Sequence, residues 1–541
     1  MHNLMQDWPL RVSTIIDHAA KYHAGRLVKG RAAEGHLTET TYADLRVKAL
    51  KVGQMLRRLG LKPGEVVGCM AWNTPRHMEI WYGVSGAGAV LHTLNPRLFK
   101  DQLDYIVNHA EDRILMVDAD LVPVIEALKD HISGVRHIIA LTDRANMPES
   151  TLDLLCYEDL LAAEDGDAAW VMGAETDACG ICYTSGTTGN PKGVVYTHRS
   201  NVMHAMTAVQ PDMLGLSAAD TIMPVVPLFH ANGWSIGYAA PLVGATMMMP
   251  GRDMSPQGLY PLLEDGVTIT AAVPTVWLLL LQYLKANPEL RFSTLKNVVI
   301  GGSSCPRAVI EAFQNIYGVQ VLHAWGMTEM SPLGTVCSFK PEVLDRDASA
   351  RLDVQETVGH PPYTVELDIL DDAGAPLPRD GQTQGRLVAK GVAVVGEYLK
   401  AGKPATGEDG WFDTGDIATM DASGYVRITD RSKDVIKSGG EWISSIDLEN
   451  AAVAHPQVAQ AAAIGIAHPK WDERPILVVV PTPDQHPDKD EILGLVAEKF
   501  AKWQVPDDIV YMETLPLTAT GKISKLTLRQ QLDEMDYKLP G

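Results

Sequence analysis

The chain has 541 residues, of which 46% are hydrophobic and 21% charged, and its formal net charge is −21. This length exceeds one ordinary domain, and the composition is typical of a soluble globular enzyme. The negative charge argues against nucleic acid or an anionic membrane surface as a main partner, because both would be repelled. An anionic ligand would therefore require local positive charge.

The sequence predicts neither secretion nor membrane insertion. The first twenty residues lack a basic flank followed by an apolar core, so no signal peptide is predicted. Two uncharged stretches, 221–251 and 266–284, are interrupted by proline and are predicted to be buried core or tunnel lining. Six scattered cysteines indicate a reducing cytoplasm. Cys179 and Cys182 match a CxxC pattern, but three residues apart on a strand they face opposite sides, which favours a structural role.

Apolar strands and amphipathic helices alternate along the first 300 residues. This alternation is typical of α/β layers with largely parallel sheets. Helices are predicted over 41–59, 75–87 and 121–129, and strands over 66–71, 113–117, 135–141, 267–273 and 297–300.

The pattern changes twice toward the C-terminus. Short strands follow residue 360, at 365–370, 386–389 and 425–429; a second α/β pattern then begins near residue 431, with helices over 447–454 and 489–500 and strands over 459–466 and 476–480. The predicted fold class is therefore α/β with several subdomains. A large N-terminal domain, residues 1–430, has layered α/β sheets plus a small β-rich subdomain, and residues 431–541 form a small α+β domain.

Residues 183–193 read YTSGTTGNPKG and carry the clearest chemical signal. Glycines let backbone N–H groups turn inward, hydroxyls add donors and the lysine adds positive charge, which together indicate a polyphosphate cradle. The spacing is not that of a Walker A loop. A flexible connector is disfavoured, because a strand-like run, 178–183, leads into the segment. The candidate phosphate ligands are Thr184, Ser185, Gly186, Thr187, Thr188, Gly189 and Lys192.

Five further segments point to the same chemistry. The run 323–332, HAWGMTEMSP, offers an aromatic ring and the carboxylate of Glu329, a group that binds Mg²⁺ together with substrate phosphates. The small residues of 301–306 would let a flat base approach, and 411–416 places Asp416 at a turn, where it suits ribose hydroxyls. Charge and glycine gather in 430–442, and 518–522 presents Lys522 on a glycine turn.

With these segments in this order, the chain resembles the acyl-adenylate-forming superfamily, which comprises acyl-CoA synthetases, luciferases and peptide-synthetase adenylation domains. The resemblance runs over essentially all 541 residues. The segments 225–234, 436–445, 468–475 and 501–507 are most similar to bacterial fatty acyl-CoA ligases, including medium-chain and 3-methylmercaptopropionate types.

The resemblance implies a two-step reaction that uses ATP, Mg²⁺ and coenzyme A. A carboxylate attacks the α-phosphate and releases pyrophosphate, and coenzyme A then displaces AMP. Lys522 would bridge the carboxylate and the α-phosphate, Thr184 and Glu329 would bind the metal, and a mobile C-terminal domain would swing about Lys433. Besides the cradle, the implied ATP/AMP contacts are Gly302, Ser303, His323, Ala324, Trp325, Gly326, Met327, Thr328, Asp416, Arg431, Lys433, Lys437 and Lys522. The implied coenzyme A contacts are Ser438, Gly439, Gly440, Glu441 and Trp442.

The resemblance also implies an acyl site at His230, Gly233, Trp234, Trp277 and Gly301. His230 is counted among the catalytic residues and Trp234 as an indole gate, although a core histidine and a core tryptophan stay open as alternatives. No charged residue in 229–234 offers a partner to an amino group, which favours an apolar acid. The candidates are a short- or medium-chain fatty acid or 3-methylmercaptopropionate, with an aryl- or arylalkanoate as the alternative.

Two other functional classes stay open. One is an adenylating enzyme with another acceptor, such as a carrier protein, against which the stretch 437–445 favours free coenzyme A. The other is a catalytically inactive acyl- or nucleotide-binding protein, against which the joint presence of Lys522, Glu329, Thr184 and Lys192 counts. A homodimer is left open, and neither nucleic acid nor a stable membrane insertion is expected.

Overall fold

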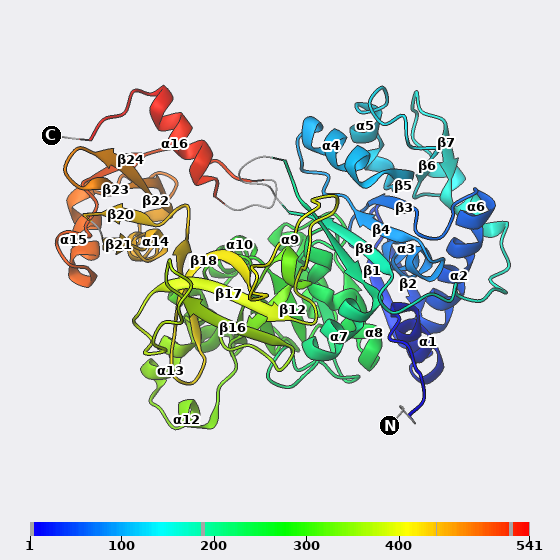
Figure 1. Ribbon diagram of the computed structural model, residues 1–541, viewed down its shortest axis with the longest axis horizontal. Coiled ribbons are helices and arrows are strands. Elements are labelled where there is room, and N and C mark those ends of the chain that lie inside the picture. Colours follow the sequence, from blue (N-terminus) through cyan, green and yellow to red (C-terminus); the bar gives the residue numbers. More distant parts are fainter. Residues whose placement is uncertain (1–4, 185–189, 440, 519–522, 540–541) are drawn as a thin grey trace.

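The computed structural model describes residues 5–184, 190–439, 441–518 and 523–539. Two large, mostly parallel sheets form the N-terminal part of the chain (Figure 1). The seven-stranded sheet has the order β7 Leu154–Cys156, β6 His137–Ala140, β5 Asp112–Val117, β3 Val66–Met70, β4 Val90–Thr93, β8 Ala178–Tyr183 and β9 Gly193–Thr197. The eight-stranded sheet has the order β15 Leu333–Val336, β14 Gln320–Gly326, β13 Asn297–Ile300, β12 Ile269–Ala272, β10 Thr221–Pro224, β11 Thr246–Met249, β1 Leu27–Arg31 and β2 Leu37–Thr41.

Helices fill the space between the two sheets and cover their outer faces. Helix α3 contacts β4 of one sheet and β1 of the other, and nearly all its side chains are buried. The resulting layers are α/β/α/β/α, as expected for parallel sheets that bury both faces. The inner helices are α1 Val12–Tyr22, α2 Tyr42–Arg58, α3 Pro75–Gly86, α7 His198–Ala208 and α8 Ile236–Val243. The outer helices are α4 Lys100–Ala110 and α5 Val122–Glu126 on one side and α9 Pro256–Glu264, α10 Pro274–Ala286 and α11 Arg307–Glu311 on the other, and α6 Tyr157–Ala162 packs against α2.

Local sequence chemistry explains the helix starts. Thr41 Oγ1 accepts from the Asp44 N–H at the start of α2, and Thr74 Oγ1 accepts from the His77 N–H at the start of α3. Pro75 occupies the first turn of α3, where its missing N–H costs nothing. The helix predicted over 121–129 is shorter than expected and spans only Val122–Glu126, because the Leu128 and Lys129 N–H groups donate to carbonyls only three residues back.

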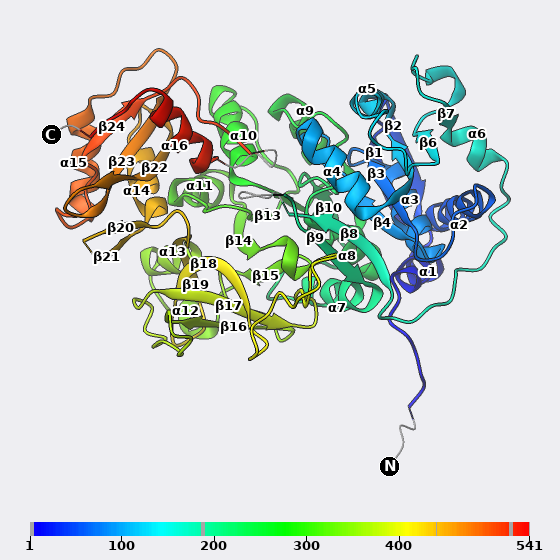
Figure 2. The same cartoon turned by 45° about the horizontal axis from the view of Figure 1, so that its top comes forward.

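The β-rich subdomain and the C-terminal domain follow in order, as predicted. An antiparallel sheet comprises β16 Val365–Leu370, β17 Gly385–Gly391, β18 Phe412–Met420 and β19 Val426–Arg431, after two short helices, α12 Pro341–Leu344 and α13 Ala348–Gln355. The C-terminal part contains β20 Ile436–Ser438, β21 Glu441–Ile443, β22 Val458–His468, β23 Asp472–Pro481 and β24 Asp508–Tyr511, with α14 Ser445–Val453, α15 Lys489–Lys499 and α16 Lys525–Glu534. Figures 1 and 2 show this sheet beside the β-rich subdomain and apart from the two large sheets. The predicted fold class is confirmed, whereas the boundary between residues 430 and 431 stays a prediction.

The uncharged stretches form strands and helices at the eight-stranded sheet, and the cysteines lie in the protein interior. The stretches 221–251 and 266–284 contribute β10, α8 and β11, and β12 and α10. Within the described ranges, no helix has both the length and the apolar character needed to cross a bilayer. All six cysteines are buried, and Cys179 and Cys182 belong to different hydrophobic clusters, as expected for opposite faces of β8.

Candidate active site

The two ends of the predicted phosphate cradle meet. Strand β8 ends at Tyr183 and pairs antiparallel with β9, which begins at Gly193. The Thr184 N–H donates to the Lys192 carbonyl at 2.9 Å, and the Lys192 N–H donates to Thr184 Oγ1 at 3.2 Å. This pairing fixes the base of the cradle. Its remaining candidate ligands, Ser185, Gly186, Thr187, Thr188 and Gly189, lie outside the described residues.

A tyrosine joins the cradle to the predicted metal ligand. The Lys192 ammonium lies 4.8 Å from the ring centroid of Tyr398, and the Tyr398 hydroxyl donates to Glu329 Oε1 at 2.8 Å. Burial and the Glu329 carboxylate raise the pKa of Tyr398, so its hydroxyl remains a donor. Lys192 and Glu329, two predicted site residues that are far apart in the sequence, therefore both contact the Tyr398 side chain.

The segment that carries Tyr398 is fixed at both ends. The Val395 N–H donates to the Glu329 carbonyl at 2.7 Å, and the Leu399 N–H donates to the Gly193 carbonyl at 2.9 Å. Sequence reasoning missed Tyr398, because the residue stands in no recognisable motif. Only the packing of this segment across β9 and Glu329 reveals it.

Three predicted nucleotide contacts form one group around Asp416, which is 1% exposed. Its Oδ2 accepts from the Trp325 indole N–H at 3.0 Å, and its Oδ1 pairs with Arg431 Nε at 2.9 Å. Each carboxylate oxygen has a second acceptor position, so the group can still accept from a sugar hydroxyl. Asp416 is thereby oriented and charge-compensated.

The ends of β13 and β14 approach each other through their backbones. A Cβ at Gly301 would lie 2.9 Å from the Ala324 carbonyl oxygen, and a Cβ at Gly326 would lie 2.1 Å from the Pro332 carbonyl oxygen. Gly302 has φ +85°, and the Thr328 carbonyl accepts from the Tyr196 hydroxyl at 2.7 Å. Gly301, Gly302, Ala324 and Gly326 therefore lie together with little side-chain bulk, whereas Ser303 is exposed and the Thr328 side chain is buried.

His323 lies inside the protein. Its side chain is buried, and neither ring nitrogen has a hydrogen-bonding partner among the residues that the structure describes. Burial lowers the pKa of His323 to about 4, so the ring is neutral near pH 7. The predicted nucleotide contact at His323 is therefore best sought in its backbone, on β14.

The acyl candidates His230, Gly233 and Trp234 stand on a tight, strained turn. The 3₁₀ helix Ala231–Ser235 contains Gly233 at φ +54°, Trp234 at φ +54° and Ser235 at φ +62°. Non-glycine residues with positive φ cost energy and concentrate at functional sites. The turn brings the Trp234 ring to 3.1 Å from where a Cβ of Gly301 would lie. Trp234 and Gly301, two acyl predictions, are thus brought together.

Trp277 packs in a different hydrophobic cluster from Trp234, although its indole N–H and the Gly301 N–H donate to the same carbonyl, that of Ala272. It is fully buried, its indole N–H donates to the Ala272 carbonyl at 3.3 Å, and its ring packs edge-on against Phe313 at 6.0 Å. These residues belong to the cluster between the eight-stranded sheet and α9, α10 and α11, whereas Trp234 belongs to the inner cluster. The two tryptophans therefore lie in separate hydrophobic clusters.

The predicted hinge residue Lys433 is exposed and stands beside a buried ion cluster. Asp430 Oδ2 accepts from the Ser445 N–H at 2.7 Å, and Lys525 pairs with Glu449 at 2.6 Å. Burial raises the pKa values of Asp430 and Glu449, and the Lys525 ammonium opposes that rise. Because Lys525 begins α16, the cluster ties the start of this helix to the end of β19.

The predicted coenzyme A contacts lie on the β20–β21 hairpin. Lys437 pairs with Trp442 and Ser438 with Glu441 across the two strands. The Arg474 guanidinium donates to Ser438 Oγ at 3.2 Å, and Gly439, at φ +63°, begins the turn. Lys437 and Glu441 are exposed, and Trp442 is half-buried. Gly440 and Lys522 lie outside the described residues.

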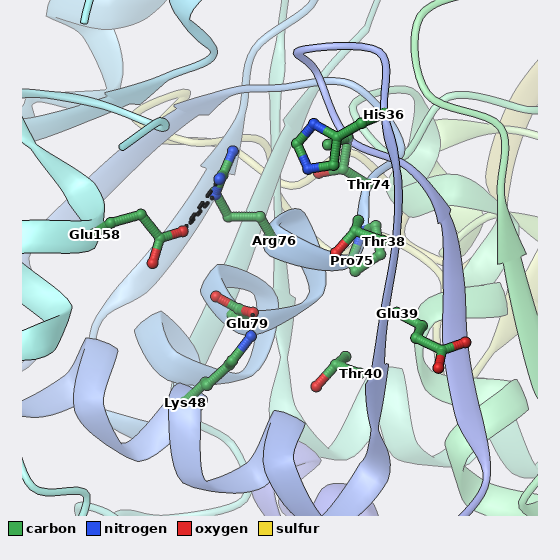
Figure 3. A pocket seen from close by; sticks show the side chains of 11 residues that line it. His36, Thr38, Glu39, Thr40, Lys48, Thr74, Pro75, Arg76, Glu79 and Glu158 are labelled. Atoms are coloured by element: carbon green, nitrogen blue, oxygen red, sulfur yellow. Dashed lines mark hydrogen bonds and ion pairs between the residues drawn. The ribbon is translucent and has the colours of Figure 1, made fainter. Parts of the chain in front are cut away.

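A polar pocket of about 60 Å³ lies elsewhere, beside the start of α3 (Figure 3). Its lining includes Arg76, Glu158, Lys48 and Glu79, whose charges compensate each other in ion pairs. None of the predicted site residues lines it. We interpret it as part of the frame that fixes α3.

Known proteins resemble this chain over nearly its whole length. Residues 17–399 match the family described as AMP-binding enzyme, and residues 447–522 match the AMP-binding enzyme C-terminal domain. The chain is 48% identical to 3-methylmercaptopropionyl-CoA ligase of Ruegeria pomeroyi, covering 97% of this chain and 98% of that protein. It is 43% identical to medium-chain-fatty-acid–CoA ligase of Ectopseudomonas oleovorans, covering 97% and 96%. The solved anthranilate CoA ligase AuaEII, in complex with anthranoyl-AMP, shares the fold at a TM-score of 0.86 and 24% identity, covering 97% of this chain and 99% of that chain.

The buried ion cluster generates a stability prediction. Lys525→Met should lower the free energy of unfolding by about 3–5 kcal/mol, because Glu449 and Asp430 would lose the cation that compensates them. Urea unfolding followed by circular dichroism measures the loss. Lys489→Met is the control: it removes a more exposed ion pair with Asp508 in the same domain and should cost about 1 kcal/mol or less. Equal losses in the two variants would contradict the interpretation.

Proposed function

The chain belongs to the AMP-binding enzyme family and is an AMP-forming acid–thiol ligase, and from this premise we propose that it activates an apolar acid of short to medium chain length, including 3-methylmercaptopropionate. The observation that carries the proposal is a group of buried apolar side chains, Val225, Val226, Leu228, Phe229 and Trp234, the last of which lies against Gly301. The segment 225–234 contains no charged side chain that could pair with an amino group or a second carboxylate. The two bacterial relatives, named for a thioether acid and for medium-chain fatty acids, support the same chemistry.

As an ATP-using adenylating ligase, the enzyme must bring two anions together in the first step. We propose that the cradle from Thr184 to Lys192 holds the β- and γ-phosphates and that Lys522 bridges the carboxylate and the α-phosphate. Fixed cations and oriented N–H donors stabilise the charge that develops there. Asp416, held by Trp325 and Arg431, is proposed to bind the ribose hydroxyls.

Glu329 suits the Mg²⁺ that accompanies ATP. Its Oε1 is occupied by the Tyr398 hydroxyl, and among the described residues Oε2 takes no hydrogen bond. No group of three His, Cys, Asp or Glu side chains within the described ranges could hold a metal ion alone. A single carboxylate fits Mg²⁺, which commonly takes its other ligands from phosphates and water. With Thr184 as second ligand, the ion would neutralise phosphate charge when bound.

The second step requires that pyrophosphate leave and that a thiol enter. We propose that residues 431–541 rotate about Lys433, so that Lys522 moves away and the hairpin with Gly439, Gly440 and Trp442 approaches the adenylate. The exposed position of Lys433, two residues after β19 ends, supports a hinge there. Rotation about a few backbone bonds is a common way for enzymes to separate two half-reactions in one site.

Lys522→Ala should slow adenylate formation about 10²–10³-fold, because one charge is removed from a phosphoryl transition state. Pyrophosphate release with acid and ATP measures this step. Thioester formation from synthetic acyl-AMP should be largely spared. Lys538→Ala, at an exposed lysine near the C-terminus, is the control and should change neither half-reaction. Equal loss in both half-reactions would contradict the domain rotation.

Glu329→Gln should raise the Mg²⁺ concentration needed for half-maximal pyrophosphate release, since the amide keeps the shape but loses the negative charge. Glu397→Gln, which removes the same charge at an exposed position next to Tyr398, is the control and should leave the titration unchanged. If Glu329→Gln shows the wild-type Mg²⁺ titration, Glu329 serves only to hold the 395–399 segment.

A panel of carboxylic acids, from C2 to C16 with methylthio- and arylalkanoates, tests the substrate proposal through coenzyme A consumption. Acids of roughly four to ten chain atoms should be best, with neighbouring lengths differing about 10-fold at most, because each buried methylene contributes about 0.8 kcal/mol. Trp234→Ala should shift the optimum to longer or bulkier acids. Trp277→Phe tests the prediction that Trp277 belongs to the acyl site. An unchanged chain-length optimum in this variant would contradict that prediction. Preference for acetate or an amino acid would contradict the apolar site.

A further inference from the structure

Asn73, three residues after the end of β3, holds the segment that leads to the acyl candidates through hydrogen bonds. Its side chain is 1% exposed. Its Nδ2 donates to the Pro224 carbonyl at 2.7 Å and the Val226 carbonyl at 2.9 Å, and its Oδ1 accepts from the Leu228 N–H at 2.7 Å. Two carbonyls need the amide hydrogens and one N–H needs the oxygen, so only one orientation of the amide satisfies all three.

The hydrogen bonds of Asn73 affect the position of Trp234 through Leu228. The Leu228 side chain lies beneath Gly233, where a Cβ would stand 2.5 Å from Leu228 Cδ2. The His230 N–H donates to the Pro227 carbonyl and the Gly233 N–H donates to the His230 carbonyl, both at 3.0 Å. Backbone hydrogen bonds therefore connect the segment held by Asn73 to the turn that carries Trp234. Trp234 follows and meets Gly301. A shift of Leu228 would therefore move the indole.

The backbone on either side of Asn73 is held by further hydrogen bonds and an ion pair. The Gly251 N–H donates to the Asn73 carbonyl at 3.0 Å, and the Trp72 N–H donates to Asp118 Oδ2 at 2.7 Å. Arg76, in the first turn of α3, pairs with Glu158 at 3.1 Å and also donates to the Leu141 carbonyl at 2.7 Å (Figure 3). Asn73 thus lies in a segment fixed by several contacts, whereas the turn that it holds contains residues with strained φ values.

We propose that Asn73 is a positioning residue for the acyl site. By fixing the 224–228 backbone, it sets the distance between the Trp234 indole and Gly301, and this distance determines selectivity for acid length. This inference rests on the proposed function. Asn73 is not expected to touch ATP or coenzyme A. Its loss should therefore act on the acid and leave the nucleotide unaffected.

The test compares Asn73→Asp with Tyr42→Phe. The aspartate keeps the size and the acceptor for Leu228, but it places oxygen against two carbonyl oxygens. Tyr42→Phe also removes a buried side-chain-to-carbonyl hydrogen bond, to Ala245 at 2.5 Å, just before β11, away from the acyl turn. For each protein, kcat and KM are measured for butanoate, octanoate and 3-methylmercaptopropionate at saturating ATP, then KM for ATP, with the melting temperature alongside.

For Asn73→Asp we expect the KM for acid to rise about 10-fold or more, as for loss of buried hydrogen bonds at a binding surface. The octanoate-to-butanoate ratio of kcat/KM should change at least about 5-fold, and the KM for ATP should stay within about 2-fold. Tyr42→Phe should lower only the melting temperature. An unchanged ratio in Asn73→Asp, or a parallel loss for acid and ATP, would overturn the proposal.

A second variant keeps the test decisive. If Asn73→Asp does not fold, Leu228→Val is used instead, because it shortens the side chain under Gly233 and keeps the backbone hydrogen bonds to Asn73. The same change in the octanoate-to-butanoate ratio of kcat/KM would support the proposal. An unchanged ratio would overturn it. The wild-type rates in the same assay report separately on the proposed function. If wild type uses only aryl acids, the ratio is taken between two aryl acids of different length.

Discussion

The site depends on one constraint: the carboxyl ends of strands from two different parallel sheets meet on a single segment. Asn73 after β3 binds the 224–228 backbone, and Thr93 at the end of β4 donates to the Phe229 carbonyl at 3.4 Å. Ligands of open α/β sheets bind at the carboxyl ends of strands. Here two such edges are joined by hydrogen bonds, so neither sheet can shift without displacing the 224–229 segment.

A second link crosses from the seven-stranded sheet to the β-rich part of the chain. Tyr398 lies between Lys192 and Glu329, and its segment bonds the backbone of both Gly193 and Glu329. The aromatic ring attracts the Lys192 cation, and the phenol hydroxyl donates to the Glu329 carboxylate. The arrangement holds both charged groups on one tyrosine side chain, as the proposed phosphate and metal contacts would require.

Much of the fold could be predicted from the sequence, because buried parallel strands and capped helices leave local patterns. β13 over Asn297–Ile300 and the start of α3 at Pro75 follow from such patterns. The cradle also has a local signature. Asn73 and Tyr398 have none, since their partners lie far away in the chain. Trp234 and Trp277 look alike in sequence, and only the side of the sheet on which each packs separates them.

The burial of all six cysteines has a consequence for an enzyme whose acceptor is itself a thiol. Burial raises the pKa values of Cys179 and Cys337 to about 12, and it raises those of Cys69 and Cys305 as well. Thiol–disulfide exchange proceeds through an accessible thiolate. This protein therefore offers no cysteine sulfur to compete with coenzyme A for the acyl group. For the same reason it resists capture as a mixed disulfide when the coenzyme pool becomes oxidised.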